Sequence, residues 1–356
     1  LDNFEPLIGK AALDLVWRIL QQAPAVKVLI TSRERLNLAA EWLVDLAGLA
    51  FPTGNRHVNA QGYPAVELFV RRSHRVRPDF VLDAGAGEAV ARICQLTEGL
   101  PLAIELAAAW MRTLPPAQIA EELARGLALL ASTAHDIPER HRSMAAVFEH
   151  SWTLLDNEAQ MALAQLSVFR AGFDQAAAQA VAYAGLPLLQ TMVDRSLLRM
   201  DDTGRFDMHP LVRQFAGDRL SQSPQATATR SRHAQHFAGL TGRREHEFHG
   251  QQDRLALQWM LREADNIRTA WDWGVRQADA ALLEPFIESF LYFFDIQGRY
   301  RECVDLIRDA VHALQSMNRQ PGASLGLARV IALRAAFRFR LGEFESARED
   351  AEKALA

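Results

Sequence analysis

The chain has 356 residues, of which 49% are hydrophobic and 23% are charged, and its formal net charge at pH 7 is −4. This composition predicts an ordinary globular protein of two to three domains, and the negative charge argues against a large nucleic-acid-binding surface. No stretch approaches eighteen uninterrupted apolar residues, which argues against a membrane-spanning helix. Cys94 and Cys303 are the only cysteines, so neither a disulfide framework nor a zinc site is expected. We therefore expect a reducing, cytoplasmic location.

Residues 1–52 alternate the sequence patterns of strands and helices. Residues 11–22 carry apolar side chains at helical spacing. Residues 26–31 form a β-branched and apolar run that is typical of a buried parallel strand, and residues 41–49 could supply another short strand. This order predicts the second half of a nucleotide-binding α/β domain.

Two strand ends carry the chemistry of this segment. Asp2 is an acid that would hold Mg²⁺, and Arg33 follows Thr31 and Ser32, where it would sense a terminal phosphate. No G-x-x-x-x-G-K-[ST] loop occurs anywhere in the sequence. Because the first residue is Leu, we expect the chain to be a fragment whose phosphate-binding loop lies upstream. Without that loop, these 356 residues alone should bind nucleotide poorly.

The middle of the chain is predicted to be helical. After a linker over 53–63, the pattern predicts a helical domain over 64–135, in which Gly99 ends one helix and Pro101 begins the next. Residues 138–222 then predict three helices, a β-hairpin and a closing helix, which is the layout of a winged helix. Their predicted ranges are 144–155, 157–169 and 186–196 for the helices, 197–200 and 205–208 for the strands, and 210–220 for the last helix.

The last segment, 229–356, predicts helical repeats. Gly298 and Gly342 are each followed by an aromatic residue two positions later and by small residues at matched offsets. This pattern is typical of the tight turn and close packing of a tetratricopeptide-like helical pair. The two copies are forty-four residues apart, and an insertion over 315–326 explains the excess.

Five motifs in order resemble those of the signal-transduction ATPases with numerous domains, the STAND class that includes NB-ARC proteins and AfsR-like or MalT-like bacterial regulators. They are Leu1-Asp-Asn-Phe-Glu5, Thr31-Ser-Arg-Glu-Arg-Leu36, Gly99-Leu-Pro-Leu102, Met208-His-Pro210 and the tetratricopeptide-like tail. The resemblance implies a mainly α chain: an N-terminal α/β remnant (1–52), a helical domain (64–135), a winged helix (138–222) and an incomplete α-solenoid (229–356).

The resemblance also implies a site for ATP or ADP and Mg²⁺. It assigns nucleotide or Mg²⁺ contacts to Asp2, Asn3, Thr31, Ser32, Arg33, Gly99, Leu100, Pro101 and His209, with Asp2 as the Mg²⁺ residue. Asn3 stands where active ATPases often carry a glutamate, and asparagine cannot take a proton, so at most slow hydrolysis is expected unless Glu5 substitutes. Pro210 stands where the plant and animal members of the family have an aspartate.

Each of these residues also has a purely structural interpretation. Asp2 could be an exposed acid, Arg33 could form an interdomain ion pair, and His209 could be a core histidine. The Gly99 element could be a helix–helix turn. We interpret Glu34 and Arg35 as solvated residues.

Several other features lack a specific signal. The candidate recognition helix over 186–196 offers only Arg195 as a base, so we do not expect this unit to bind DNA. His246 and His249 are interpreted as surface histidines. Asp201 and Asp202 are explained by turn chemistry. The three tryptophans of the repeat region, Trp259, Trp271 and Trp273, are interpreted as core.

The sequence therefore predicts the core of an ATP/ADP-dependent signalling switch, part of a bacterial transcriptional regulator whose output domain lies elsewhere. By resemblance, nucleotide holds the winged helix closed, a protein or small-molecule effector acts at the repeats, and release permits self-oligomerisation. DNA would be contacted only through a domain outside these residues. The alternative is a helical-repeat interaction scaffold with a non-functional NTPase remnant.

Overall fold

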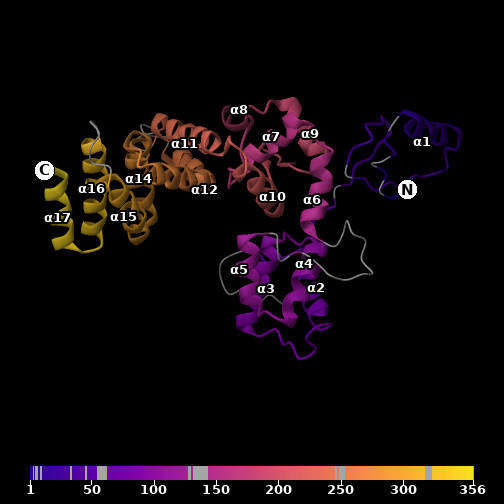
Figure 1. Ribbon diagram of the computed structural model, residues 1–356, viewed down its shortest axis with the longest axis horizontal. Helices are drawn as coiled ribbons and strands as arrows, with labels where there is room; N and C mark the ends of the chain where they lie inside the picture. Colours follow the sequence, from indigo (N-terminus) through magenta and orange to yellow (C-terminus); the bar gives the residue numbers. More distant parts are fainter. Residues whose placement is uncertain are drawn as a thin grey trace. The chain divides into compact units, whose positions relative to one another are not determined.

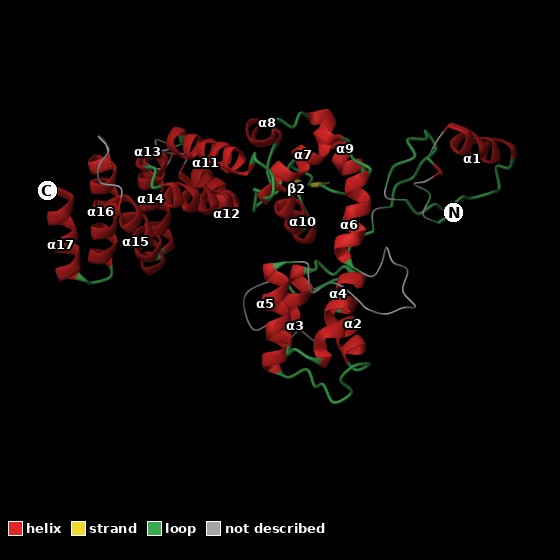
Figure 2. Cartoon of the chain, in the orientation of Figure 1, coloured by secondary structure: helices red, strands yellow, loops and turns green. Residues whose placement is uncertain are grey.

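The computed structural model describes residues 1–355 except positions 3, 5, 6, 9, 33, 45, 54–61, 127–129, 131–142, 245, 246, 248–252 and 317–322. The described chain is mainly helical, as predicted (Figures 1 and 2). It divides into two compact units. Unit 1 comprises residues 1–167 and 185–220, and unit 2 comprises residues 168–184 and 221–356. The predicted domain boundaries stay predictions.

Unit 1 begins with helix α1 (Lys10–Gln22), close to the predicted range. Val16 on α1 and Phe4, which precedes the helix, are buried, at 5% and 4% exposure. The buried parallel strand predicted over 26–31 is wrong: no strand is assigned among the described residues before α2, and Leu29 is 83% exposed. The short strand considered over 41–49 is likewise not assigned in the described residues.

The run over 26–31 pairs with the first residues of the chain through a few hydrogen bonds. Leu1 N donates to Leu29 O at 2.8 Å, and Thr31 N donates to Leu1 O at 3.0 Å, which is the alternation of a parallel pair. A parallel strand becomes buried when it has neighbours on both edges and helices on both faces. These bonds join the run only to the first residues of the chain, so most of its side chains stay exposed.

Four helices then form a bundle: α2 (Pro64–Ser73), α3 (Ala84–Leu96), α4 (Pro101–Ala109) and α5 (Pro116–Arg125), with a 3₁₀ turn over Trp110–Arg112 after α4. Its hydrophobic core also includes Met144, Leu211 and Phe215 from later in the chain. Proline stands in the first turn of α2, α4 and α5, where its missing N–H costs no helical hydrogen bond. Asp83 caps α3 by accepting from Ala86 N at 2.8 Å. The largest fully buried side chains of the bundle are Phe69, Ile93, Ile104, Met111 and Ile119. Cys94 is buried there too, which raises the pKa of its thiol to about 12.

The rest of unit 1 contains three helices, a hairpin and a closing helix, as the sequence predicts. They are α6 (Met144–Thr153), α7 (Asn157–Leu166), α9 (Leu186–Asp194), the antiparallel strands β1 (Arg199–Met200) and β2 (Phe206–Asp207), and α10 (Pro210–Ser221). The predicted turn between the strands is confirmed. Asp201 accepts from Thr203 N (2.8 Å), Thr203 Oγ1 (2.7 Å) and Arg205 N (3.0 Å), and Gly204 adopts a φ of 77°.

Unit 2 includes a helix that the sequence analysis does not predict, α8 (Gln175–Ala182). Asp174 caps its first turn, and Tyr183 ends it in the left-handed conformation with a φ of 55°. Unit 2 continues with α11 (Ala226–Arg243), α12 (Asp253–Gln277), α13 (Ala280–Leu283) and a 3₁₀ turn (Glu284–Phe286). Trp271 is 1% and Trp273 9% exposed, so both are core residues as predicted.

The repeat region ends with α14 (Ile287–Gln297), α15 (Tyr300–Ser316), α16 (Ala323–Arg340) and α17 (Phe344–Leu355). The repeated glycines lie in the turns before α15 and α17, where Gly298 has a φ of 63° and Gly342 a φ of 78°. The matched small residues Cys303 and Ala347 are both buried. The helical-pair pattern therefore predicts both turns and both helix starts.

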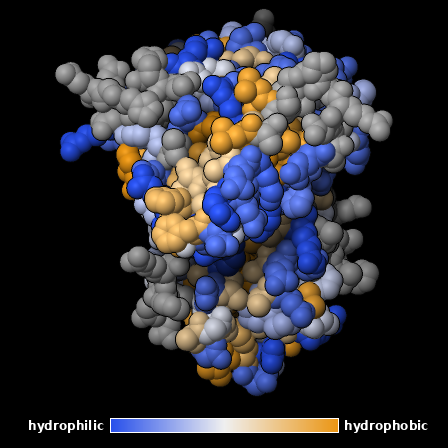
Figure 3. Space-filling view, turned by 90° about the vertical axis from the view of Figure 1, so that its left-hand side faces the viewer, coloured by the Kyte–Doolittle hydropathy of each residue, from blue (hydrophilic) through white to orange (hydrophobic). Residues whose placement is uncertain are grey.

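The surface of unit 2 carries exposed apolar side chains on its last two helices, and the rings of Phe339 and Phe344 lie 5.4 Å apart. Leu325, Phe339, Phe344 and Leu355 are each more than half exposed. The space-filling view from this side shows apolar side chains in small groups between hydrophilic ones (Figure 3). Among the described residues, none of the helices combines the length and the apolar character needed to cross a membrane.

Candidate functional site

The turn between α3 and α4 carries the predicted Gly99 element. Glu98 and Gly99 both adopt left-handed conformations, with φ of 43° and 70°. Gly99 O accepts from Leu49 N at 2.8 Å, so the turn is hydrogen-bonded to the stretch between α1 and α2. A Cβ on Gly99 would lie 2.8 Å from Leu49 N and still closer to Leu49 O. Only glycine therefore fits this position without moving the backbone.

His209 begins α10 and reaches across to this turn. Its side chain is 8% exposed. Nδ1 accepts from Leu211 N at 3.1 Å, and His209 O accepts from Arg213 N at 2.9 Å, so the residue caps the helix. Because Nδ1 is an acceptor, the ring proton of the neutral imidazole lies on Nε2, which donates to Thr97 O at 3.3 Å. The structure thus brings His209 to the turn that carries the Gly99 element, through a contact with Thr97 that spans 112 residues of sequence.

A charged pair covers the same contact. Glu98 Oε2 lies 2.7 Å from Arg199 Nη2 on β1 and 3.7 Å from His209 Nε2. Burial lowers the pKa of His209 to about 4, and the positive charges of Arg199 and Arg213 act in the same direction, while the bond to Thr97 opposes them. His209 is therefore neutral at pH 7, and the Glu98–Arg199 pair supplies the ionic part of the contact. Glu98 and Arg199 are absent from the sequence-predicted set because neither lies in a motif.

The other residues of the Gly99 element have structural roles here. Leu100 N donates to Thr97 O at 2.9 Å, and Pro101 is the first residue of α4, with an exposed side chain. Thr97 O therefore accepts two hydrogen bonds, one from Leu100 and one from His209. The helix–helix turn interpretation of this element is confirmed, and its contact with a nucleotide stays a prediction.

Asp2, Thr31 and Ser32 form a second group near the start of the chain. The Thr31 hydroxyl donates to Asp2 Oδ1, and both side chains are exposed. Ser32 Oγ accepts from Glu34 N at 3.1 Å, which orders the turn that follows. Asn3 and Arg33 lie outside the described residues, so the structure gives no position for the predicted phosphate sensor.

The sequence interpretation of Glu34 and Arg35 as solvated residues is wrong. Arg35 Nε lies 3.1 Å from Asp194 Oδ1, and Glu34 Oε1 lies 3.6 Å from Arg195 Nη1. Arg195 also donates to Leu154 O at 2.5 Å. All four charged side chains are between 25% and 35% exposed. The adjacent residues Glu34 and Arg35 thus pair with Arg195 and Asp194 at the end of α9. Residues so far apart in the sequence have no spacing that would predict this match.

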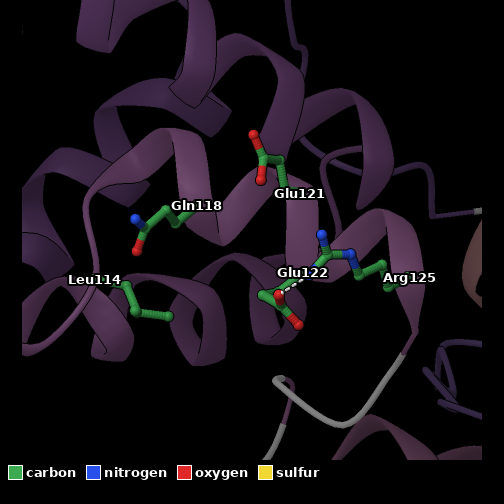
Figure 4. Close-up of a pocket in the computed structure, with 5 residues that line it drawn as sticks. All are labelled: Leu114, Gln118, Glu121, Glu122 and Arg125. Carbon is green, nitrogen blue, oxygen red and sulfur yellow. Dashed lines mark hydrogen bonds and ion pairs between the residues drawn. The ribbon is translucent and has the colours of Figure 1, made fainter.

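A pocket of about 450 Å³ lies on the surface of α5 and is lined by Leu114, Gln118, Glu121, Glu122 and Arg125, none of which is a predicted site residue (Figure 4). Glu122 and Arg125 pair with each other there, and Glu121 adds a second carboxylate. An acidic lining repels phosphate groups, so this pocket does not suit a nucleotide.

The group of Asp2 and Thr31 differs from the contact of His209 in how well it suits a nucleotide and its metal. The exposed Asp2 carboxylate and Thr31 hydroxyl are oxygen donors of the kind that Mg²⁺ prefers. In the described part of the chain, no cluster of three or more His, Cys, Asp or Glu residues could hold a metal. His209 does not fit a phosphate contact in this conformation, because protein atoms engage both of its ring nitrogens.

Comparisons with known proteins place the chain beside mycobacterial relatives. No protein-family model matches it. The "Putative HTH-type transcriptional regulator Rv0890c" of Mycobacterium tuberculosis is 32% identical over 286 residues, which make up 77% of this chain and 31% of that protein. The "Uncharacterized protein Rv0894" of the same species is 33% identical over 250 residues, 67% of this chain and 60% of that protein. The chain thus spans about a third of the length of the first relative.

A solved structure was also compared. The STAND protein with a tetratricopeptide repeat sensor PH0952 from Pyrococcus horikoshii aligns with 91% of this chain and 44% of its own, at 15% sequence identity and a TM-score of 0.35. A TM-score this low does not establish a shared fold.

Proposed function

We propose that the chain is the central part of a STAND-type signalling switch within a bacterial transcriptional regulator. The observation that carries this proposal is the buried contact between His209 and the turn at Thr97, because it joins the two motifs on which a nucleotide lock would depend. The name of the mycobacterial relative supports the regulator class. DNA would be contacted by a domain outside these residues.

In this proposal the closed state is the one described here. His209 and the Glu98–Arg199 pair hold the winged-helix segment on the Gly99 turn, and the pairs of Glu34 and Arg35 hold the end of α9. Asp2 and Thr31 would hold Mg²⁺ in the full-length protein. ATP or ADP would supply the charge difference that selects between closed and open states. Opening requires His209 to leave Thr97, which would free Nε2 for another acceptor.

The repeat region would receive the signal. Leu325, Phe339 and Phe344 are exposed apolar side chains on α16 and the start of α17, and they suit an apolar part of a protein or small-molecule effector. Release of the winged-helix segment would then allow self-oligomerisation, as in the family that the motifs resemble. The polypeptide would act in the cytoplasm.

The test uses the full-length natural polypeptide that contains these residues. We expect the purified protein to retain ADP, detectable by chromatography after denaturation, and to bind ATP in a Mg²⁺-dependent way. Asp2→Ala should weaken the Mg²⁺-dependent binding about tenfold or more. Asp14→Ala, a change to an exposed acid on α1, is the matched control and should have no effect. Absence of any nucleotide binding by the full-length protein would overturn the proposal.

One observation favours the scaffold alternative. Both ring nitrogens of His209 and the Asp2 carboxylate already have protein partners, so the contacts described here need no nucleotide. A full-length protein that lacks nucleotide binding but still captures a partner through the repeats would be such a scaffold.

A further inference from the structure

The chain leaves unit 1 after residue 167 and returns to it at residue 185. Residues 168–184 lie in the chain between α7 and α9, which belong to unit 1, yet their contacts place them in unit 2. Their helix, α8, packs against α11. The winged-helix segment is therefore interrupted by seventeen consecutive positions, 168–184, that are built into the repeat region.

One buried side chain fastens the start of this segment. Asn266 on α12 is fully buried, and its Oδ1 accepts from Arg170 N at 2.7 Å and from Ala171 N at 3.5 Å. Its Nδ2 donates to Gly172 O at 2.9 Å and to Glu263 Oε2 at 2.9 Å. The amide thus uses both of its donors and both acceptor positions. This side chain thus bonds three backbone groups of a stretch without regular secondary structure, and its loss would remove all three hydrogen bonds.

Aromatic and cationic side chains fasten the same segment elsewhere. Phe169 and Phe173 stack with ring centroids 4.6 Å apart, and Phe169 lies 5.2 Å from the ring of His233 and 6.2 Å from that of Phe237 on α11. At the far end, Arg232 donates to Val181 O at 2.8 Å, and its guanidinium lies 4.7 Å from the ring of Tyr183. Both ends of the segment are thus held by α11 and α12.

We propose that residues 168–184, called the hook below, transmit movements of the repeat region to α7 and α9 of unit 1. This inference rests on the proposed switch and names its internal route. A displacement of α11 or α12 would move residues 168–184 with it, because Asn266 and the rings around Phe169 attach them to both helices. The chain joins the hook directly to α7 on one side and to α9 on the other, so the displacement reaches both helices.

The attachment is tested by hydrogen exchange and mass spectrometry on the 356-residue chain. Asn266→Ala should raise the exchange rate of the amides in 168–184 about tenfold, because three backbone hydrogen bonds lose their partner. Asp265→Ala, at the neighbouring exposed position of α12, is the control and should leave these amides unchanged. Arg232→Ala is a milder second variant, which should affect only the far end of the hook. Unchanged exchange in both Asn266→Ala and Arg232→Ala would overturn the attachment.

The second test asks whether a change in the repeat region reaches α7 and α9. It removes a buried side chain that lies outside the hook. Phe290 on α14 is buried against Trp271, and Phe290→Ala should raise exchange in α7 and α9 about threefold or more when the hook is intact. In the Asn266→Ala background the same change should have no effect on α7 and α9. An identical response in both backgrounds, or none in either, would overturn the proposal. Nucleotide retention by full-length Asn266→Ala should stay normal, so a failure of the nucleotide switch would be recognised separately.

Discussion

The part of unit 1 that carries α9, the β-hairpin and α10 is held at two places that differ in physical character. At the start of α10, the buried and neutral His209 donates to Thr97 O. At the end of α9, Asp194 and Arg195 form ion pairs whose side chains are a quarter to a third exposed. Breaking the first contact leaves buried polar atoms without partners, whereas water and salt can replace the second. We therefore expect the first contact to contribute more to stability than the second, and only the second to depend strongly on salt.

The largest expected effect comes from filling the Gly99 turn. Gly99→Ala places a Cβ against the Leu49 backbone and also forces alanine to a φ of 70°. The two costs together should lower the free energy of unfolding by about 4 kcal/mol. Gly204→Ala is the matched control, because Gly204 has a similar φ of 77° but nothing within 4 Å of the new Cβ. Urea unfolding followed by circular dichroism measures both, and equal losses would show that the approach of Leu49 does not constrain the turn.

Acid should destabilise the folded state through the buried imidazole of His209. The folded pKa of His209 is about 4, below the ordinary value of 6.5, so the unfolded chain binds more protons between these values. The stabilisation is complete above pH 6.5 and declines as the pH falls toward 4, by about 3 kcal/mol over the window. His233 in unit 2 has a pKa lowered to about 3 by burial and contributes in the same direction. The difference between wild type and His209→Asn isolates His209, and a difference independent of pH would contradict the prediction.

The two roles of His209 can be separated by substitution. His209→Ala removes the cap of α10 and the bond to Thr97, and should cost about 2–3 kcal/mol. His209→Asn keeps a side chain that can cap the helix but cannot reach Thr97, so it should cost about 1 kcal/mol less. Thr97 O keeps its bond from Leu100 N in both variants. Urea unfolding measures both, with exposed His312→Ala as the control, and equal losses would assign the whole effect to the contact rather than the cap.

Local features of the fold are predictable from the sequence because neighbouring residues determine them. Asp201 and Gly204 define the hairpin turn, Gly298 and Gly342 define the repeat turns, and Pro101 marks the start of α4. The meeting of His209 with the Gly99 element was predictable only through the resemblance to a family, since 112 residues separate His209 from Thr97.

The features that the sequence analysis does not predict depend on tertiary partners. Helix α8 is short and Ala-rich, so its pattern is weak, and its position depends on Asn266, far along the chain. The run expected as a strand over 26–31 is bonded to Leu1 and Phe4 among the described residues, and Leu29 remains 83% exposed. Glu34 and Arg35 resemble ordinary surface charges until α9 supplies Asp194 and Arg195. Buried amides and complementary charge pairs of this kind have no sequence spacing that identifies them.

The smallest expected effect lies at these ion pairs, and charge exchange can isolate it. Arg35→Asp should cost about 0.5–1 kcal/mol, because it removes one pair and brings two carboxylates together. Adding Asp194→Arg restores an opposite-charge pair and should recover most of the loss at low salt. At 1 M NaCl the Debye length falls to about 3 Å, so the single and double variants should converge. If the double variant recovers wild-type stability at low salt and the two variants become equally stable at high salt, the contact is an ion pair that salt screens. A loss of stability that does not depend on salt would assign Arg35 a packing role instead.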